Sequence, residues 1–284
     1  MRGRRYFVGV DSDGCVFDTM ERKQKQVFIP QAIASLGFAD IADRYRATAE
    51  RVNLYSRTRG ANRFEALATC LTIMRDDPEL HARVPDPAPL WEFVRSGRPL
   101  SHEAFRDYVA ARPSAFLSLV LHWSAESNRR IAEEIAAGGP FPGAAECIAA
   151  LTQFARVMVV SATPRDALRA EWSGAGLLEH VDEVAGQERG PKKAQLAEAR
   201  ATGFAGDSCL VIGDAPGDHA AAEANDMRFF PVIPGREEAC WEELLETGIE
   251  RFRMGGFAGT YQKKLLTDFY AALDVRVGHG GSPA

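Results

Sequence analysis

The 284-residue sequence has no apolar run that approaches the roughly 20 residues a membrane-spanning helix requires. Its first residues, MRGRRYFVGV, are basic and then briefly apolar. Asp11 interrupts this run before it reaches the length of a signal-peptide core. We therefore expect a soluble protein that is neither secreted nor bound to a membrane.

Paired cysteines are also missing. The chain has no CxxC motif, and its five cysteines are dispersed as Cys15, Cys70, Cys147, Cys209 and Cys240. An odd, scattered set fits a reducing compartment better than a disulfide framework, so we expect a cytoplasmic location. The six histidines show no metal-ligand spacing, and none is assigned to chemistry.

The chain also has no excess of positive charge. The net charge is −5, whereas broad binding to nucleic acid or anionic membranes favours a basic surface. We expect neither as a partner, although a local site can still be positive and bind a small anion. The composition, with 46% hydrophobic and 26% charged residues, is that of an ordinary globular protein. The chain is long enough to form one large domain or two moderate ones.

Short apolar runs recur along the chain, each followed by small or acidic residues. Runs of this kind are typical of strands buried on both faces of a parallel sheet. From Ala144 to about Ile233 they alternate with helix-forming stretches, which predicts a doubly wound, Rossmann-like α/β fold. The predicted strands are YFVGV before Asp11, ARVMVV before Ser161, a short stretch from Asp182 to Ala185, SCLVIG before Asp214, and MRFFPVI.

Three residues mark helix boundaries in this region. Pro164 suits the first turn of the helix in PRDALRAEWSGAGLLEHV, and Gly203 suits the end of the helix in PKKAQLAEARATG. Asn225 tolerates left-handed backbone geometry, so it is predicted to end the helix in DHAAAEAND.

The segment between the first strand and the rest of the sheet has a different pattern. Its amphipathic runs, such as ANRFEALATCLTIM, predict helices and few strands. We therefore expect a core domain formed by residues 1–18 and 138–275 and a helical domain formed by residues 19–137. The Gly-rich end, residues 276–284, is expected to be disordered.

Polar side chains follow three of the predicted strands. Asp11 and Asp13 follow the first strand, Ser161 follows the second, and Asp214 with Asp218 follows a later one. Ligands of open parallel sheets bind at the carboxyl ends of the strands. In extended chain, Asp11 and Asp13 project to the same side and would repel unless a cation, a proton or a phosphorylated intermediate makes use of them. A polar strand end with a glycine turn is the alternative for this stretch taken alone.

These motifs, in this order, resemble those of the haloacid dehalogenase-like (HAD) superfamily of phosphohydrolases. The resemblance covers the first strand and residues 138 to 233, and it places the helical segment where that family carries a C1-type cap domain. The matching residues are Asp11-Ser12-Asp13-Gly14 for the DxDG motif, Ser161 at a strand end, Lys192 or Lys193 at a helix start, and Gly213-Asp214 with Asp218 for the GDxxxD motif.

The resemblance implies a role for each acid. Asp11 would be the nucleophile that forms an aspartyl-phosphate, and Asp13 the general acid and base. A Mg²⁺ ion would be held by Asp11, the backbone carbonyl of Asp13, and Asp214. Asp218 would be a ligand through water or would orient the lysine.

The resemblance also implies how the phosphoryl group is bound. Ser161 and the backbone N–H of Ala162 would bind a phosphate oxygen, and the lysine would offset negative charge. Lys192 is favoured over Lys193 because it lies one helical turn before Leu196, which is expected to pack on the sheet.

The resulting prediction is a Mg²⁺-dependent phosphohydrolase that acts on a small phosphorylated metabolite. A phosphomutase would use the same core residues, and a phosphonate hydrolase would need a Schiff-base lysine such as Lys23 or Lys25. A non-catalytic phosphate-binding or regulatory module is the alternative from another class. Neither the substrate nor the oligomeric state follows from the sequence.

The helical segment contains one basic stretch, YSRTRGANRF. Its Arg57, Arg59 and Arg63 are candidates for contacts that determine substrate specificity. A solvated basic loop is the alternative explanation.

Overall fold

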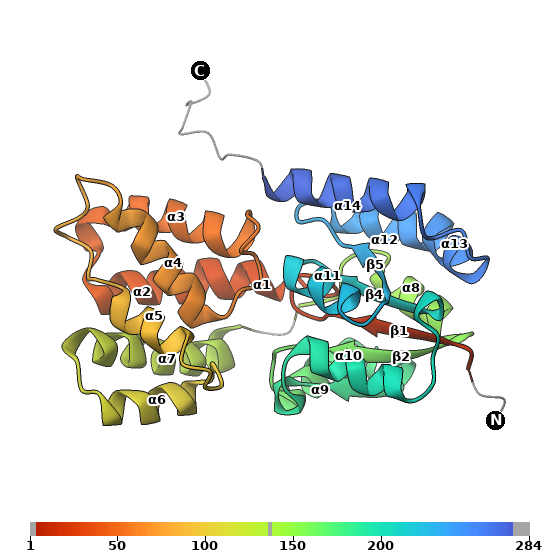
Figure 1. Ribbon diagram of the computed structural model, residues 1–284, viewed down its shortest axis with the longest axis horizontal. Helices are drawn as coiled ribbons and strands as arrows, with labels where there is room; N and C mark the ends of the chain where they lie inside the picture. Colours follow the sequence, from red (N-terminus) through yellow and green to blue (C-terminus); the bar gives the residue numbers. More distant parts are fainter. Residues whose placement is uncertain (1–3, 136–137, 275–284) are drawn as a thin grey trace, which may run out of the picture. The chain divides into compact units, whose positions relative to one another are not determined.

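The computed structural model describes residues 4–135 and 138–274, so the tail predicted to be disordered lies outside the described residues. The chain divides into two compact units. The core unit contains residues 4–20 and 138–274, and the helical unit contains residues 21–135. Figure 1 shows a sheet flanked by helices in the first and only helices in the second.

The core unit is built on a five-stranded parallel sheet with strand order β3-β2-β1-β4-β5. This order is that of a doubly wound fold, as the sequence predicts. The strands are β1 (Tyr6–Val10), β2 (Ala155–Val160), β3 (Glu183–Ala185), β4 (Cys209–Gly213) and β5 (Arg228–Pro231).

Helices connect these strands and extend beyond the last one. The α12–α14 region follows β5, and α14 packs on that strand. The bounds are α8 (Ala144–Thr152), α9 (Arg165–Gly174), α10 (Lys192–Ala201), α11 (Pro216–Glu223), α12 (Glu237–Glu243), α13 (Ile249–Arg253) and α14 (Thr260–Leu273), with a π-helical turn at Leu244–Gly248.

One predicted helix boundary is wrong. Helix α11 ends at Glu223, and the left-handed residue is Asp226, with φ 56°, not Asn225. The Asn225 side chain instead donates hydrogen bonds to the carbonyls of Ala221 and Lys193. These bonds hold Asn225 against α10 and α11, and the chain turns one residue later.

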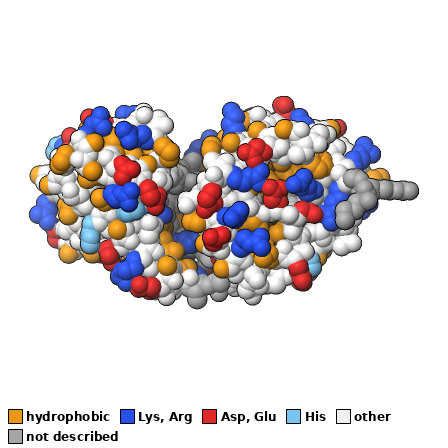
Figure 2. All heavy atoms as spheres, turned by 90° about the horizontal axis from the view of Figure 1, so that it is seen from below, with side chains coloured by type: hydrophobic (Ala, Val, Ile, Leu, Met, Phe, Trp, Pro, Cys, Tyr) orange, Lys and Arg blue, Asp and Glu red, His pale blue; other side chains and the backbone are white. Residues whose placement is uncertain are grey.

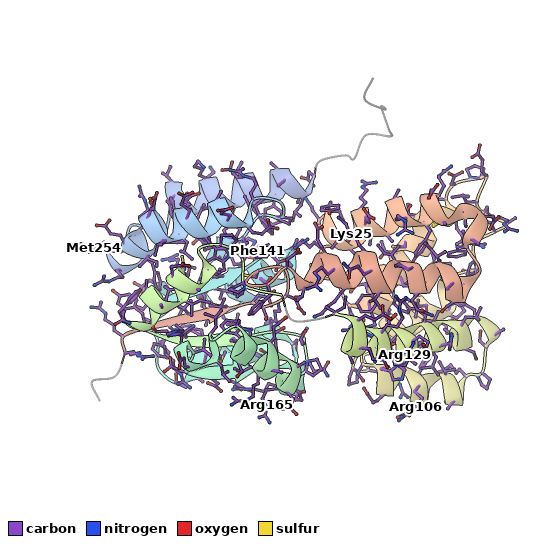
Figure 3. The ribbon with its side chains drawn as sticks, turned by 180° about the vertical axis from the view of Figure 1, so that it is seen from behind. Lys25, Arg106, Arg129, Phe141, Arg165 and Met254 are labelled. Atoms are coloured by element: carbon purple, nitrogen blue, oxygen red, sulfur yellow. The ribbon has the colours of Figure 1, made fainter. Side chains whose placement is uncertain are left out.

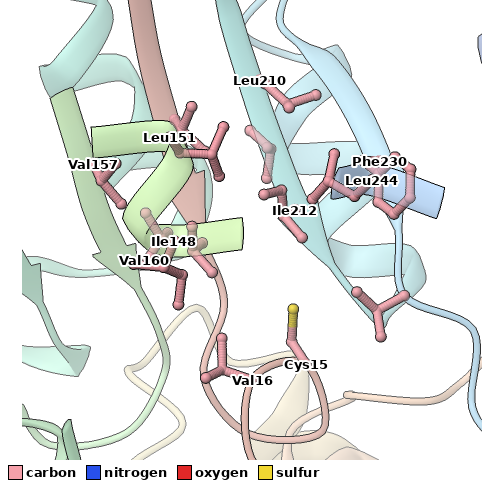
Figure 4. Close-up of a cluster of buried hydrophobic side chains, with 14 of the residues drawn as sticks. Cys15, Val16, Ile148, Leu151, Val157, Val160, Leu210, Ile212, Phe230 and Leu244 are labelled. Carbon is pink, nitrogen blue, oxygen red and sulfur yellow. The ribbon is translucent and has the colours of Figure 1, made fainter. Parts of the chain in front are cut away.

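The core of this unit lies around the central strands. In Figure 4, Val157 and Val160 of β2 face Ile148 and Leu151 of α8. The loop after β1 joins the same cluster, because Cys15 and Val16 are fully buried in it. The loop that follows Asp11 is therefore packed on the hydrophobic core.

The helical unit has a separate hydrophobic core, centred on aromatic residues such as Phe64, Phe93 and Phe105. Side-chain caps start α4 and α7: Asn62 accepts the Phe64 N–H, and Ser114 accepts the Leu117 N–H. Its elements are α1 (Thr19–Arg22, at the boundary), a π-helical turn (Lys23–Phe28), α2 (Ile29–Leu36), α3 (Ala42–Leu54), α4 (Arg63–Arg75), α5 (Ala88–Val94), α6 (His102–Ala111) and α7 (Ala115–Glu134).

Among the described residues, no helix is both long and apolar enough to cross a bilayer. On the face that Figure 2 shows, acidic and basic side chains intermingle over both units. Such mixing is ordinary for a protein surface and gives that face no long-range field of one sign.

Candidate active site

The sheet register brings the predicted site residues to one edge. Val10 of β1 pairs with Val159 of β2 and with Ile212 of β4. The residues that follow these strands therefore leave the sheet at nearly the same level. The backbone N–H of Asp11 donates to the Ile212 carbonyl at 2.9 Å, so Asp11 is tied to β4 as well as to β1.

Lys192, the first residue of α10, bridges two of the acids. Its Nζ lies 2.7 Å from Oδ2 of Asp11 and 2.6 Å from Oδ1 of Asp218. Burial would lower the pKa of Lys192, but the carboxylates of Asp11 and Asp218 outweigh it and raise that pKa. Lys192 is therefore held as an ammonium group, while Lys193 is exposed.

Close packing of α10 on the sheet sets this geometry. Leu196 is fully buried, one turn after Lys192. A Cβ on Gly9 of β1 would lie 3.0 Å from Cδ2 of Leu196, so a glycine in the strand lets the helix approach closely. The same helix carries Gln195, whose Nε2 lies within hydrogen-bond distance of the carbonyls of Ser161, Gly186 and Gly190.

Three buried carboxylates form a group that could hold a metal ion. Oxygens of Asp11, Asp214 and Asp218 lie within 4.8 Å of one another. Burial raises the pKa of Asp11 most, Lys192 opposes this, and the charges of Asp218 and Asp214 raise it further. Concentrated negative charge in a buried site favours a divalent cation, and carboxylate oxygens are the ligands that Mg²⁺ prefers. The residues present therefore fit a Mg²⁺ ion.

Asp218 has both oxygens engaged. Oδ1 accepts a hydrogen bond from Lys192, and Oδ2 accepts one from the backbone N–H of Ala215 at 3.0 Å. Its side chain lies directly against Gly213, where an added Cβ would come within 2.5 Å of Cβ of Asp218. Only glycine at position 213 leaves room for Asp218 in this place.

Asp13 is oriented differently from the other acids. Its carboxylate accepts hydrogen bonds from the hydroxyl groups of Thr19 and Thr163, the latter at 2.8 Å. It is not part of the buried carboxylate group of Asp11, Asp214 and Asp218. Two acids that are adjacent in the motif therefore have separate surroundings, as two different chemical roles would require.

The predicted phosphate-binding residues follow β2. Ser161 is buried, its N–H donates to the Ala185 carbonyl, and its Oγ accepts the Thr163 N–H at 3.2 Å. Ala162 is exposed. The turn from Ser161 to Thr163 thus lies beside Asp13, because the Thr163 hydroxyl reaches that carboxylate.

The three arginines of the helical unit differ in their surroundings. Arg57 is exposed. Arg59 is 3% exposed, and its guanidinium donates to the Leu54 carbonyl at 2.8 Å. Arg63 stacks over the Phe28 ring at 4.9 Å and donates to Asn128 at 2.6 Å; burial lowers its pKa to about 10. Arg59 and Arg63 thus make contacts within the helical unit, whereas Arg57 is exposed.

Lys25, labelled in Figure 3, belongs to a compact polar cluster of the helical unit. Its Nζ donates to Glu21 and to the Tyr55 hydroxyl, both at 2.8 Å, and that hydroxyl donates to Glu21 at 2.6 Å. Burial would lower the pKa of Lys25, but its bonds to Glu21 and Tyr55 raise it. A Schiff-base lysine must lose its proton to react, so these surroundings oppose that role.

Thr19, Thr163 and Gln195 contact the site, and sequence reasoning did not single them out. The two threonines follow motif residues by only a few positions in the sequence. This closeness is the signal that could have identified them. Gln195 carries no such signal, because glutamine within a helix usually marks an exposed position.

No protein-family profile and no curated protein matches this chain. Among solved structures, it is similar to a haloacid dehalogenase-like hydrolase from Streptococcus pneumoniae, with 13% identity, a TM-score of 0.47, and coverage of 84% of this chain and 91% of that one. It is also similar to a β-phosphoglucomutase from Clostridium difficile, with 14% identity, a TM-score of 0.48, and coverage of 88% and 97%.

A third similar structure is a HAD-superfamily hydrolase of subfamily IA from Geobacter sulfurreducens, with 15% identity, a TM-score of 0.41, and coverage of 81% and 88%. These likenesses concern the fold alone. Structural similarity at such low sequence identity identifies neither the substrate nor the reaction. Both have to be inferred from the geometry of the site.

Proposed function

We propose that this protein is a Mg²⁺-dependent phosphohydrolase of the HAD type that acts on a small phosphorylated metabolite through an aspartyl-phosphate on Asp11. The observation that carries the proposal is the Lys192 ammonium group between Asp11 and Asp218 at the carboxyl edge of the sheet, with Asp214 buried beside them. Asp13 lies outside this group and is held by hydroxyl donors.

Asp11 and Asp214 would hold the Mg²⁺ ion, together with the backbone carbonyl of Asp13. The bound ion would neutralise charge on the phosphoryl group and keep the buried carboxylates ionised. Asp218, whose Oδ1 lies 2.6 Å from Lys192 Nζ, would orient Lys192 or contact the ion through water.

The proposed reaction has two steps. The Asp11 carboxylate attacks phosphorus, the bond to the leaving oxygen breaks, and the Asp13 carboxyl gives its proton to that oxygen. A water oxygen then attacks the phosphorus of the aspartyl-phosphate, its proton passes to Asp13, and phosphate is released from Asp11. Lys192, Ser161 and the Ala162 N–H would stabilise the negative charge of the phosphoryl oxygens in both steps.

We propose a small phosphorylated metabolite as the substrate, with the helical unit supplying specificity. Arg57 is the exposed arginine of the three candidates, and we propose it as the one that contacts an anionic group of the substrate. No nucleic-acid or membrane partner is proposed. All five cysteines are buried free thiols, which suits the reducing cytoplasm that the sequence predicts.

The other reactions considered for this core find less support. A phosphonate hydrolase needs a deprotonated lysine such as Lys23 or Lys25. Of these two, Lys25 is held as an ammonium group by Glu21 and Tyr55. Borohydride reduction in the presence of a phosphonylated aldehyde should therefore leave Lys25 unmodified. A phosphomutase would return the phosphoryl group to the substrate, and only product analysis separates it from a phosphatase.

The deciding experiment measures phosphate release from p-nitrophenyl phosphate and from a panel of phosphorylated metabolites, with Mg²⁺ or with a chelator. Asp11→Asn should lose activity by several orders of magnitude, because the proposed route has no other nucleophile. Asp166→Asn is the matched control, since the Asp166 side chain is 95% exposed in the same unit. A variant Asp11→Asn that keeps more than about a tenth of the activity would refute the covalent route, and no Mg²⁺-dependent release by the wild type would favour a binding module.

A further inference from the structure

Ser12, between the two motif acids, is fully buried, and its side chain faces helix α9. The indole Nε1 of Trp172 donates to Oγ of Ser12 at 2.9 Å, and that hydroxyl donates to Oε2 of Glu171 at 3.2 Å. Trp172 is also fully buried. The hydroxyl thus has both a donor and an acceptor on α9, whereas Asp11 contacts Lys192 on α10.

The backbone of Ser12 organises the turn that carries the acids. Its N–H donates to Oδ1 of Asp11 at 2.8 Å. Its carbonyl accepts the N–H groups of Val16 at 2.9 Å and Phe17 at 3.0 Å, and that of Cys15 at 3.3 Å. A displacement of Ser12 would therefore move the Asp11 carboxylate and the whole loop to Phe17 together.

Two tryptophans hold this loop. Trp172 also meets Phe17 edge to face, with ring centroids 5.7 Å apart. Trp241 of α12, likewise fully buried, donates its Nε1–H to the Cys15 carbonyl at 3.1 Å. Helices α9 and α12 thus both contact the loop, and the bonds from α9 act on Ser12, the residue between the two acids.

We propose that Trp172 and Ser12 are positioning residues: their hydrogen bond fixes the Asp11–Asp13 turn so that Asp11 is aligned as the nucleophile. Neither side chain would touch the substrate. The proposal rests on the proposed function for its kinetic consequence, but the ordering of the turn can be measured without any activity.

The test compares Ser12→Ala, Trp172→Phe and the double variant with the wild type. Trp91→Phe is the matched control, because the Trp91 indole also donates to a hydroxyl, that of Thr72, at 3.0 Å in the helical unit. The readouts are kcat and KM for p-nitrophenyl phosphate at saturating Mg²⁺, and hydrogen exchange of the Val16 and Phe17 amides.

Each single variant should lower kcat by about tenfold to a hundredfold with little change in KM, because a slightly misplaced nucleophile slows the chemical step more than binding. The double variant should be no slower than the slower single variant, because each single substitution already removes the same hydrogen bond between Trp172 and Ser12. Val16 and Phe17 amides should exchange faster in these variants and not in Trp91→Phe. Glu171→Gln, which retains an acceptor for Ser12, should keep kcat.

Unchanged kcat in the folded Ser12→Ala and Trp172→Phe proteins would overturn the proposal, as would additive losses in the double variant. If the wild type releases no phosphate, the proposed function fails and hydrogen exchange alone decides. Faster exchange of Val16 and Phe17 in both variants then supports the positioning of the turn, and wild-type exchange rejects it. Trp172→Phe supplies the result should Ser12→Ala fail to fold.

Discussion

The ammonium group of Lys192 lies within 2.7 Å of Asp11 and 2.6 Å of Asp218, whereas its neighbour Lys193 is exposed. Replacing Lys192 with Ala removes the cation between two buried carboxylates. We expect kcat/KM to fall by two or more orders of magnitude, roughly 3 kcal/mol of transition-state stabilisation. Lys193→Ala, the control, should change little, as is usual for a surface residue. Steady-state kinetics of both variants at saturating Mg²⁺ measure this, and the reverse pattern would transfer the role to Lys193.

Gly213 tests how closely Asp218 must approach the end of β4. An added methyl group would lie 2.5 Å from Cβ of Asp218, so Gly213→Ala must push this side chain away. We expect a large loss of kcat together with a lower Tm. Gly217→Ala is the control in the adjoining helix, because a Cβ there meets nothing within 4 Å and alanine favours a helix. Equal activity of the two variants would show that the position of Asp218 is unimportant.

At the scale of single residues, the sequence predicted acids at the strand ends but not what orients them. Strand patterns predicted that Asp11 and Asp214 leave the sheet at one edge, and the register of β1 and β4 explains why. Asp13 does not join the buried carboxylates. The partners of Ser12 and Asp13 could not be predicted, because Trp172 and Thr163 approach them through the fold and not through spacing. Asn225 shows the same limit, since contacts with α10 and α11 determine its conformation.

At the scale of elements, the loop between α3 and α4 carries arginines that have either a structural role or a role in substrate specificity. Arg59 is buried and bonded to the Leu54 carbonyl, so Arg59→Ala should destabilise the helical unit by about 1–3 kcal/mol and lower the Tm. Arg57→Ala, at an exposed position, should lower the Tm less than Arg59→Ala and should raise KM for the natural substrate, with p-nitrophenyl phosphate unaffected. Thermal unfolding and kinetics of both variants test this. An equal loss of Tm in the two variants, or equal kinetics on all substrates, would favour a purely structural loop.

The elements that the sequence predicted best are the strands of the sheet. Strands buried on both faces have continuous apolar runs, such as YFVGV at β1. Short amphipathic helices have no such runs. The α12–α14 region was not predicted, because its helices are interrupted by a π-helical turn and by Gly255 and Gly259, which have positive φ. Its contribution, Trp241 against the Cys15 carbonyl, is visible only in three dimensions.

At the scale of the whole molecule, the two units have separate hydrophobic cores, so a ligand of the core unit need not stabilise the helical unit. Hydrogen exchange resolved by segment can therefore assign a stabilising effect to one unit. If the proposed Mg²⁺ site is correct, the ion should slow exchange in β1 and β4, because its ligands Asp11 and Asp214 directly follow these strands.

Asp214 decides whether the buried carboxylates form a cation site. At 100 times its dissociation constant, a ligand specific for the folded state stabilises a protein by about 2.7 kcal/mol, so Mg²⁺ should raise the Tm of the wild type. Asp214→Asn removes a ligand and also one of the negative charges within 4.8 Å of one another, so without Mg²⁺ this variant should be at least as stable as the wild type. Added Mg²⁺ should no longer raise its Tm. Asp207→Asn, at an exposed position of the same unit, should retain the wild-type response. A large loss of stability in metal-free Asp214→Asn would mean that Asp214 supports the fold through its own contacts, and an undiminished Mg²⁺ response would place the ion elsewhere.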